Sequence, residues 1–129
     1  MKRKGFTLVE IMIVVAIIGI LLAIAIPSFM RARETARAKA CQENLQKIDS
    51  AKEQWALETN KSNGYVLDIT FLEDEEVVGP EGYIKKKPIC PAGGEYTVNV
   101  IGVDPECSIG VSLNNPAFYH VLPGASPEL

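Results

Sequence analysis

The feature that most constrains this chain is an apolar segment near its start. Residues 11–26 contain no charged or hydrogen-bonding side chain, and three cations stand at positions 2–4. As a helix, residues 6–29 would be about 36 Å long at about 1.5 Å per residue, which exceeds the hydrocarbon thickness of about 30 Å. A secretory signal peptide has a shorter apolar core. The segment therefore predicts a membrane-spanning helix and leaves room for one small domain in 129 residues.

Most of the charge lies after this segment. Residues 31–129 carry 10 Lys or Arg and 15 Asp or Glu, a net charge of −5. The acidic balance excludes a broad nucleic-acid surface, so no nucleic acid is expected as a partner. Cations flank the apolar segment on both sides, which leaves its orientation in a membrane open.

Glu10 is unusual because it lies at the start of the apolar segment. A lone charged side chain costs about 2.5 to 3.5 kcal/mol at the centre of a bilayer. One interpretation is that Glu10 stays solvated at the level of the lipid headgroups. The other is that it pairs with a cation of a second molecule, because a low dielectric strengthens such a pair. Pro27, near the other end, predicts a bend or a local loss of helix.

The residues around Glu10 carry a family resemblance. Gly5-Phe6-Thr7-Leu8-Val9-Glu10, after a basic leader and before an apolar helix, closely resembles the processing site of type IV prepilins and type II secretion pseudopilins. The resemblance implies cleavage between Gly5 and Phe6 and N-methylation of Phe6. Cleavage would leave the amine of Phe6 at the helix start, where we expect it to pair with Glu10 of an adjacent subunit in filament assembly. The resemblance also assigns the helix kink to Pro27.

The resemblance further implies a domain organisation, partners and a location. Residues 1–5 would be a cleaved leader, residues 6–29 the transmembrane and assembly helix, and residues 30–129 an extracytoplasmic pilin head. The implied partners are other copies of the chain in a homopolymer, minor pilins or pseudopilins, the prepilin peptidase, and the inner-membrane platform protein and assembly ATPase. The chain would sit in the bacterial inner membrane before assembly and in a periplasmic or cell-surface filament afterwards. Residues 83–88 resemble a segment of major pseudopilins.

A second helical pattern follows the membrane segment. Residues 31–60 contain no Gly or Pro, and residues 60–64, Asn-Lys-Ser-Asn-Gly, predict the end of a helix. Apolar residues recur at steps of three or four and form one stripe, opposite a polar face: Cys41, Leu45, Ile48, Ala51 and Trp55. One continuous helix from residue 6 to 60 would be about 80 Å long.

The remaining residues predict a small sheet. Segments 95–101 and 106–111 are rich in β-forming residues and are joined by turn residues, which indicates an antiparallel hairpin. Residues 118–122 are expected to form a third short strand. So small a sheet needs a helix against one face. We therefore expect an α+β, pilin-like fold, with the long N-terminal helix packed against a small antiparallel sheet.

Residues 65–82 connect helix and sheet and contain the acidic run Glu73-Asp74-Glu75-Glu76. Carboxylates are suitable calcium ligands, but four consecutive acids cannot all face one ion. A solvated surface loop with a short helical turn at residues 69–75 is the favoured interpretation.

The chain has three cysteines, Cys41, Cys90 and Cys107. In an extracytoplasmic head one disulfide is expected. Cys90 with Cys107 is the favoured pair, and Cys41 with Cys90 is the rival. A zinc site built from the three cysteines and His120 is numerically possible. It is disfavoured because the cysteine spacings of 49 and 17 fit no common module, so no metal and no cofactor are predicted.

Two classes of function fit these observations. The first is a structural subunit, a pilin or major pseudopilin, that polymerises into a helical filament. The alternative is a periplasmic binding or enzymatic domain tethered by a single membrane helix. The head has one His and no Gly-rich phosphate loop or Ser-His-Asp arrangement. Catalytic residues are therefore not predicted, and the chain is not expected to be an enzyme.

Overall fold

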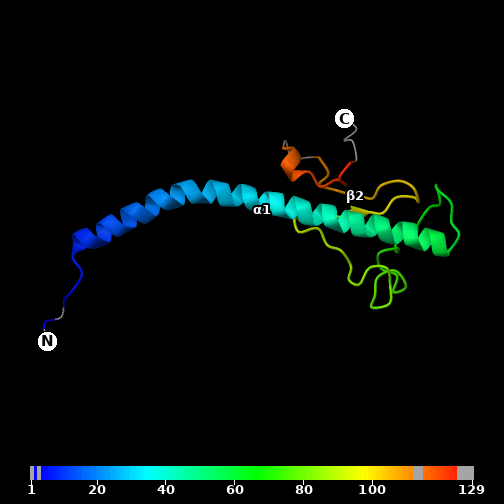
Figure 1. The fold of residues 1–129 in the computed structure, drawn as a ribbon, viewed down its shortest axis with the longest axis horizontal. Coiled ribbons are helices and arrows are strands. Elements are labelled where there is room, and N and C mark those ends of the chain that lie inside the picture. The colour runs from blue at the N-terminus through cyan, green and yellow to red at the C-terminus, as the bar shows by residue number, and fades with distance from the viewer. Residues whose placement is uncertain (1, 3, 112–114, 125–129) are drawn as a thin grey trace. The chain divides into compact units, whose positions relative to one another are not determined.

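A computed structural model describes residues 2, 4–111 and 115–124. Its elements in chain order are the helix α1 (Leu8–Glu58), the strands β1 (Tyr96–Thr97) and β2 (Glu106–Cys107), and the short 3-10 helix η1 (Pro116–Phe118). Figure 1 shows α1 as the dominant element, with the chain that follows it folded around its C-terminal half. The predicted α+β fold is confirmed.

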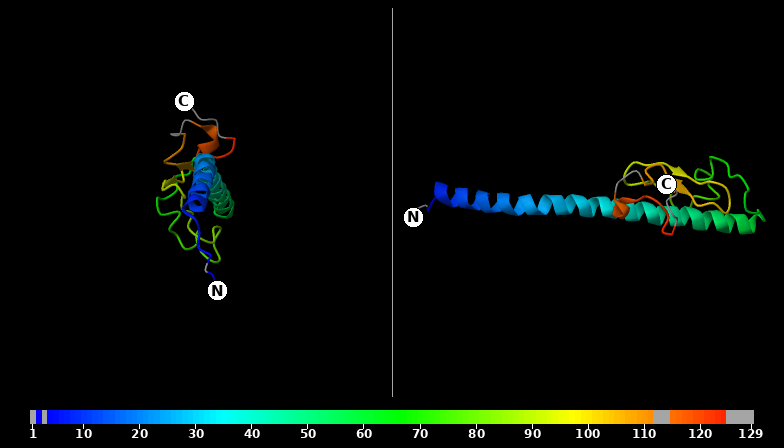
Figure 2. Two further views of the ribbon diagram at one scale, coloured as in Figure 1. Left: turned by 90° about the vertical axis from the view of Figure 1, so that its left-hand side faces the viewer. Right: turned by 90° about the horizontal axis from the view of Figure 1, so that it is seen from above.

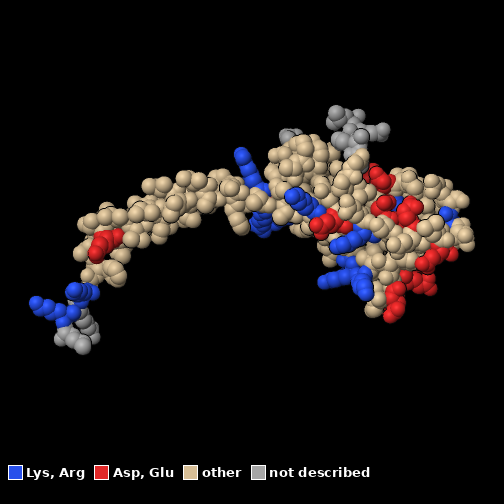
Figure 3. Space-filling view, viewed as in Figure 1, with Lys and Arg blue, Asp and Glu red and all other residues tan. Residues whose placement is uncertain are grey.

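The chain forms two compact units, Met1–Glu34 and Thr35–Leu129, and α1 contributes to both. From residue 8 to residue 30 α1 is exposed along its length, and this part of its surface is almost free of charged side chains (Figure 3). Among the described residues α1 is the one helix long and apolar enough to cross a membrane, with a mean hydropathy of 3.1 over 18 residues. By length and composition, α1 is therefore a candidate membrane span.

The second unit, called the head below, has its core on the predicted apolar stripe of α1. Segments on different sides of the helix cover it (Figure 2). One cluster joins Ile48 and Ala51 of α1 to Phe71, Leu72, Val77 and Ile84. A second cluster joins Cys41 and Leu45 to Cys90 and Cys107. Trp55 is half-buried at the end of the stripe, in edge-on contact with the ring of Phe71.

The connection at residues 65–82 contributes more to the head than the sequence indicated. Phe71, Leu72 and Val77 are at most 8% exposed and complete the first cluster. A hydrogen-bonded turn, with the Asp74 N–H donating to the Thr70 carbonyl at 3.0 Å, lies where a helical turn was expected. The acidic residues and the apolar ones therefore face opposite ways along one segment.

The predicted hairpin is present, but its strands are short. β1 pairs antiparallel with β2 in the register Tyr96 with Cys107 and Thr97 with Glu106. Asn99 has a φ of 59°, in the left-handed region, which ends the extended conformation soon after β1. Pro105 has no N–H to donate, so pairing begins only at β2.

The prediction of a third strand at residues 118–122 is wrong. Its first residue ends η1, and within the segment His120 alone pairs, with Gly110, through an isolated bridge. Asn115 caps η1 by accepting a hydrogen bond from the Ala117 N–H at 3.0 Å, and Pro116 fits a first helical position because it needs no donor. This local capping favours a helical turn over a strand.

A buried lysine on α1 was not predicted. Lys52 is 0% exposed, and its Nζ donates hydrogen bonds to the carbonyls of Val98, at 2.9 Å, and Val103. Burial lowers the pKa of Lys52, against the opposing effect of Asp49, whose carboxylate lies 4.0 Å away. Lys52 thus holds the loop after β1 against the helix.

Candidate functional site

The start of α1 is closed by two side chains. The backbone N–H of Thr7 donates to Oε2 of Glu10 at 2.8 Å, and the Thr7 hydroxyl donates to the same oxygen at 3.0 Å. In return the Glu10 N–H donates to the Thr7 hydroxyl at 3.3 Å. This reciprocal arrangement is a capping box. The spacing Thr-x-x-Glu before an apolar run is the sequence signature from which this cap could have been predicted.

The predicted processing residues precede this cap. Gly5 and Phe6 lie outside α1, and Phe6 is 87% exposed. No other part of the described chain comes within 4 Å of the position a side chain would take at Gly5. The described chain therefore leaves both residues uncovered, and cleavage between them stays a prediction.

The apolar face of the first unit has no cover within the described chain. From position 8 to 30 every large hydrophobic side chain is about half exposed or more: Leu8, Val9, Ile11, Met12, Ile13, Val14, Val15, Ile17, Ile18, Ile20, Leu21, Leu22, Ile24, Ile26, Phe29 and Met30. α1 continues through Pro27, so the helix is not lost there. The kink at Pro27 stays a prediction.

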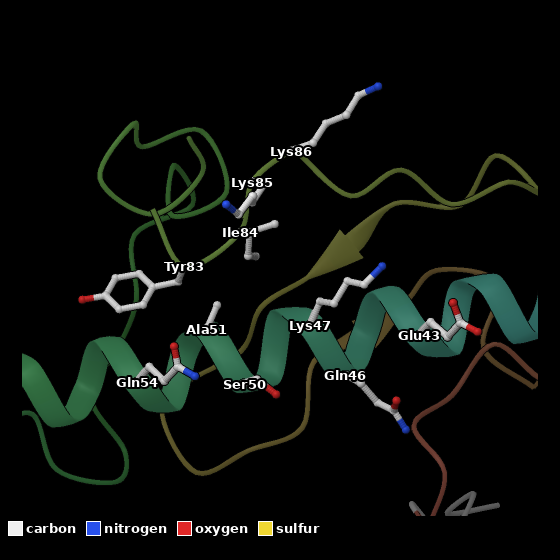
Figure 4. A pocket seen from close by; sticks show the side chains of 10 residues that line it. All are labelled: Glu43, Gln46, Lys47, Ser50, Ala51, Gln54, Tyr83, Ile84, Lys85 and Lys86. Atoms are coloured by element: carbon white, nitrogen blue, oxygen red, sulfur yellow. The ribbon is translucent and has the colours of Figure 1, made fainter. Parts of the chain in front are cut away.

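The segment that resembles major pseudopilins borders a groove against α1. The groove has a volume of about 680 Å³ and lies between residues 83–86 and the outer face of the helix. Figure 4 shows Ile84 directed toward Ala51 of α1, and Lys86 directed away. The Tyr83 hydroxyl donates a hydrogen bond to Glu58, a bond that raises the pKa of Tyr83. The segment is thus attached to α1 and positions basic side chains at the rim of the groove.

Two of the four consecutive acids have local partners. Glu73 pairs with Lys87 at 2.9 Å, and Asp74 accepts a hydrogen bond from the Glu76 N–H at 2.9 Å. These contacts account for the acidic run as a structured surface loop. A calcium site there stays untested.

The three cysteines converge in the head, although the sequence separates them widely. Sγ of Cys107 lies 3.8 Å from Sγ of Cys90, and all three thiols are free and buried. Burial raises the pKa of Cys41 and of Cys107. Burial alone would also raise the pKa of Cys90, but hydrogen bonds from the backbone at Ala92 and Gly94 and from the other thiols lower it. The predicted disulfide between Cys90 and Cys107 stays a prediction.

The comparisons with known proteins agree on one family. Residues 1–26 match the family model described as the prokaryotic N-terminal methylation motif. The chain is 40% identical over 93 residues to competence protein ComGC of Bacillus subtilis (strain 168), an alignment that covers 72% of this chain and 86% of that relative. The chain belongs to the family of type IV pilins and type II secretion pseudopilins. The resemblance seen in residues 5–10 is thereby confirmed.

Other relatives of this pilin-family chain fall into two groups. It is 29% identical over 102 residues to the type II secretion system core protein G of Pectobacterium carotovorum, with 74% of this chain and 65% of that protein covered. It is 39% identical over 73 residues to the type IV major pilin protein PilA of Myxococcus xanthus, with 57% and 33% covered. The chain thus spans just under two thirds of the first of these relatives. No solved structure matches the chain significantly.

Proposed function

We propose that this chain is the structural subunit of a pilus-like or pseudopilus filament, and that it acts by assembly rather than catalysis. In this proposal residues 1–5 are a leader removed by a prepilin peptidase, and the new amine of Phe6 is N-methylated. Residues 6–29 hold the subunit in the bacterial inner membrane and later pack in the filament. Residues 30–129, which include the head, form its extracytoplasmic part.

The observation that carries the proposal is the uncovered apolar surface of α1 directly after the methylation motif. An apolar patch much larger than a few hundred Å² calls for a lipid or protein cover. Lipid covers it before assembly, and the same faces of neighbouring copies cover it afterwards. Ala16, Gly19 and Ala23 let helices approach closely.

Glu10 would then mark the register between subunits. Its carboxylate accepts the bonds of Thr7 within one chain, and a carboxylate oxygen pair offers about four lone-pair sites. Capacity therefore remains for the Phe6 amine of an adjacent subunit, and a low dielectric strengthens that ion pair. The other partners in this proposal are minor pilins or pseudopilins, the platform protein and the assembly ATPase.

N-terminal mass spectrometry of filament protein tests the proposal. Assembled protein should begin at methylated Phe6, and Gly5→Val should leave an uncut precursor because a β-branched side chain replaces the small residue before the cut. Gly19→Val is the matched control for cleavage: it makes the same change within the apolar helix, where no other part of the described chain lies within 4 Å, and in the membrane pool it should be cut normally. Filament protein that begins at Met1 or near Ala25 would contradict the proposal.

A further inference from the structure

Four metal-binding side chains from four separate segments meet in the head. Cys41 belongs to α1, Cys90 precedes a turn, Cys107 ends β2, and His120 follows η1. Their donor atoms all lie within 4.8 Å of one another. Each residue is at most 5% exposed.

Two of the six distances between these donors match those of a tetrahedral zinc site. A zinc ion with Zn–S bonds of about 2.3 Å and Zn–N bonds of about 2.0 to 2.1 Å sets its sulfurs about 3.8 Å apart and a sulfur and nitrogen about 3.6 Å apart. Sγ of Cys107 and Sγ of Cys90 are 3.8 Å apart. Nδ1 of His120 lies 3.5 Å from Sγ of Cys90. The other donor pairs also lie within 4.8 Å of one another.

We propose that Cys41, Cys90, Cys107 and His120 bind one zinc ion as a closed structural site. Three sulfurs and one imidazole are a donor set that zinc prefers, and four protein ligands leave no position for a substrate. On binding, the three thiols release their protons to solvent and the imidazole binds in its neutral form, so no electron is transferred. A disulfide would use only two of the four converging donors.

Backbone groups lie close to two of the three sulfurs. The backbone at Ala92 and Gly94 hydrogen-bonds Cys90, and that at Ile109 hydrogen-bonds Cys107. Partners of this kind around the ligands fix the ligands and tune metal affinity.

Two further residues surround the cluster closely. The Tyr96 hydroxyl donates to Sγ of Cys41 at 3.4 Å and accepts from the Asn44 amide at 3.1 Å. A Cβ at Gly94 would come within 2.6 Å of Sγ of Cys107, far inside van der Waals contact. Glycine at position 94 therefore lets the turn after Cys90 close onto the cluster.

The ion would join parts of the head that the sheet does not. β1 and β2 contain two residues each, so backbone pairing alone holds little of the head together. The ligands connect α1, the turn after residue 90, β2 and the segment after η1. The last of these also contacts α1 through a hydrogen bond from the Gln42 amide to the Tyr119 carbonyl at 2.9 Å and through the packing of Leu122 against the second cluster. Metal binding of this kind contributes directly to folding.

Metal analysis of the full chain tests this inference. The chain is purified in detergent without a polyhistidine tag, and zinc is measured by mass spectrometry after gel filtration. About one zinc per chain is expected. Cobalt(II) in place of zinc should produce the visible absorption of a tetrahedral thiolate complex. Thermal unfolding should shift to lower temperature when a strong chelator removes the zinc.

Variants separate a ligand from a residue that merely fills space. Cys41→Ser and His120→Asn should each reduce zinc to near zero, whereas His120→Cys restores a ligand and should bind zinc again. Lys52→Met is the control for a destabilised head with all four ligands intact, and it should keep about one zinc per chain. Gly94→Ala should weaken zinc binding by about tenfold or more, because it displaces the sulfur of Cys107.

The alternative to a zinc site is a disulfide between Cys90 and Cys107, which can also be measured. A chain isolated with a disulfide between Cys90 and Cys107, with Cys41 free, and with no zinc after incubation with equimolar zinc under reducing conditions would overturn the inference. Normal zinc content in both Cys41→Ser and His120→Asn would overturn it too. The inference does not depend on filament assembly, and either result would leave the proposed function intact.

Discussion

Thr7 and Glu10 satisfy each other's backbone N–H groups at the start of α1. Oε2 of Glu10 accepts both the N–H and the hydroxyl of Thr7, at 2.8 and 3.0 Å. Glu10 therefore has a role within a single chain, in addition to the pairing with a neighbouring subunit that we propose. A capping residue typically stabilises a helix by about 1 kcal/mol, so the two roles need separate variants.

Glu10→Val should prevent assembly without preventing insertion or cleavage. The substitution makes the helix more apolar and leaves the bond after Gly5 unchanged, but it removes the partner of the Phe6 amine. Filament yield should fall about tenfold or more, since about 1.4 kcal/mol of lost pairing is a factor of ten. Glu10→Asp should be intermediate because it keeps the charge with a shorter reach. Quantitative immunoblots of sheared filaments and of membranes measure both pools.

Thr7→Val is the control that separates capping from pairing. It removes the hydroxyl that bonds Glu10 but keeps the carboxylate. It should cost a few tenths to about 1 kcal/mol of helix stability and leave filament yield close to that of the parent. Equal loss of filaments in Thr7→Val and Glu10→Val would show that capping alone explains Glu10.

Lys52→Met should destabilise the head. The substitution keeps a long unbranched side chain, one atom shorter than lysine, but leaves the carbonyls of Val98 and Val103 without the ammonium donor. Loss of a partner for buried acceptors costs about 1 to 3 kcal/mol. Urea unfolding of the full chain in detergent, followed by Trp55 fluorescence, measures the change. Lys47→Met, on the exposed face of α1, should change stability by less than about 0.5 kcal/mol.

The burial of Lys52 predicts how the free energy of unfolding depends on pH. Burial lowers the pKa of Lys52 below its ordinary 10.5, while Asp49, Glu53 and Asp104 act in the opposite direction. Between the lowered pKa and 10.5 the unfolded chain binds the proton more tightly, so the free energy of unfolding rises with pH across that window. The stability advantage of the parent over Lys52→Met should therefore widen as the pH rises toward 10.5. A stability difference between parent and Lys52→Met that narrows as the pH rises would contradict the burial of a charged lysine.

Phe71→Ala should strongly destabilise the head, although Phe71 lies in a segment that the sequence predicts to be a connecting loop. Phe71 is 5% exposed and its ring meets Trp55 edge-on, with centroids 5.7 Å apart. Removal of a buried Phe side chain costs about 3 to 5 kcal/mol. Ile69→Ala is the matched control two residues away, because Ile69 is 97% exposed, and it should change stability by less than about 0.5 kcal/mol. The urea midpoints of the two variants show whether Phe71 belongs to the core while Ile69 lies on the surface.

The amino-acid sequence alone determined the long helix, its division into an apolar and an amphipathic part, and the family. These features depend on local patterns: an uninterrupted apolar run, a stripe at steps of three and four, and the motif at residues 5–10. The sequence also predicted the end of the helix at residues 60–64, and α1 ends at Glu58, just before them. Sequence patterning overestimated the sheet, because β-propensity does not show where Asn99 adopts a left-handed conformation.

Only the tertiary structure decided which distant residues meet. Lys52 sits on a polar-looking helix position, and its burial depends on two carbonyls about fifty residues away. Cys41, Cys90, Cys107 and His120 follow no metal-binding spacing, so the sequence argued against a site, and the folded head brings their donor atoms within 4.8 Å. Local periodicity reports which face of an element is apolar. It carries no information on which faces come together, because that is set by packing and loop closure over the whole chain.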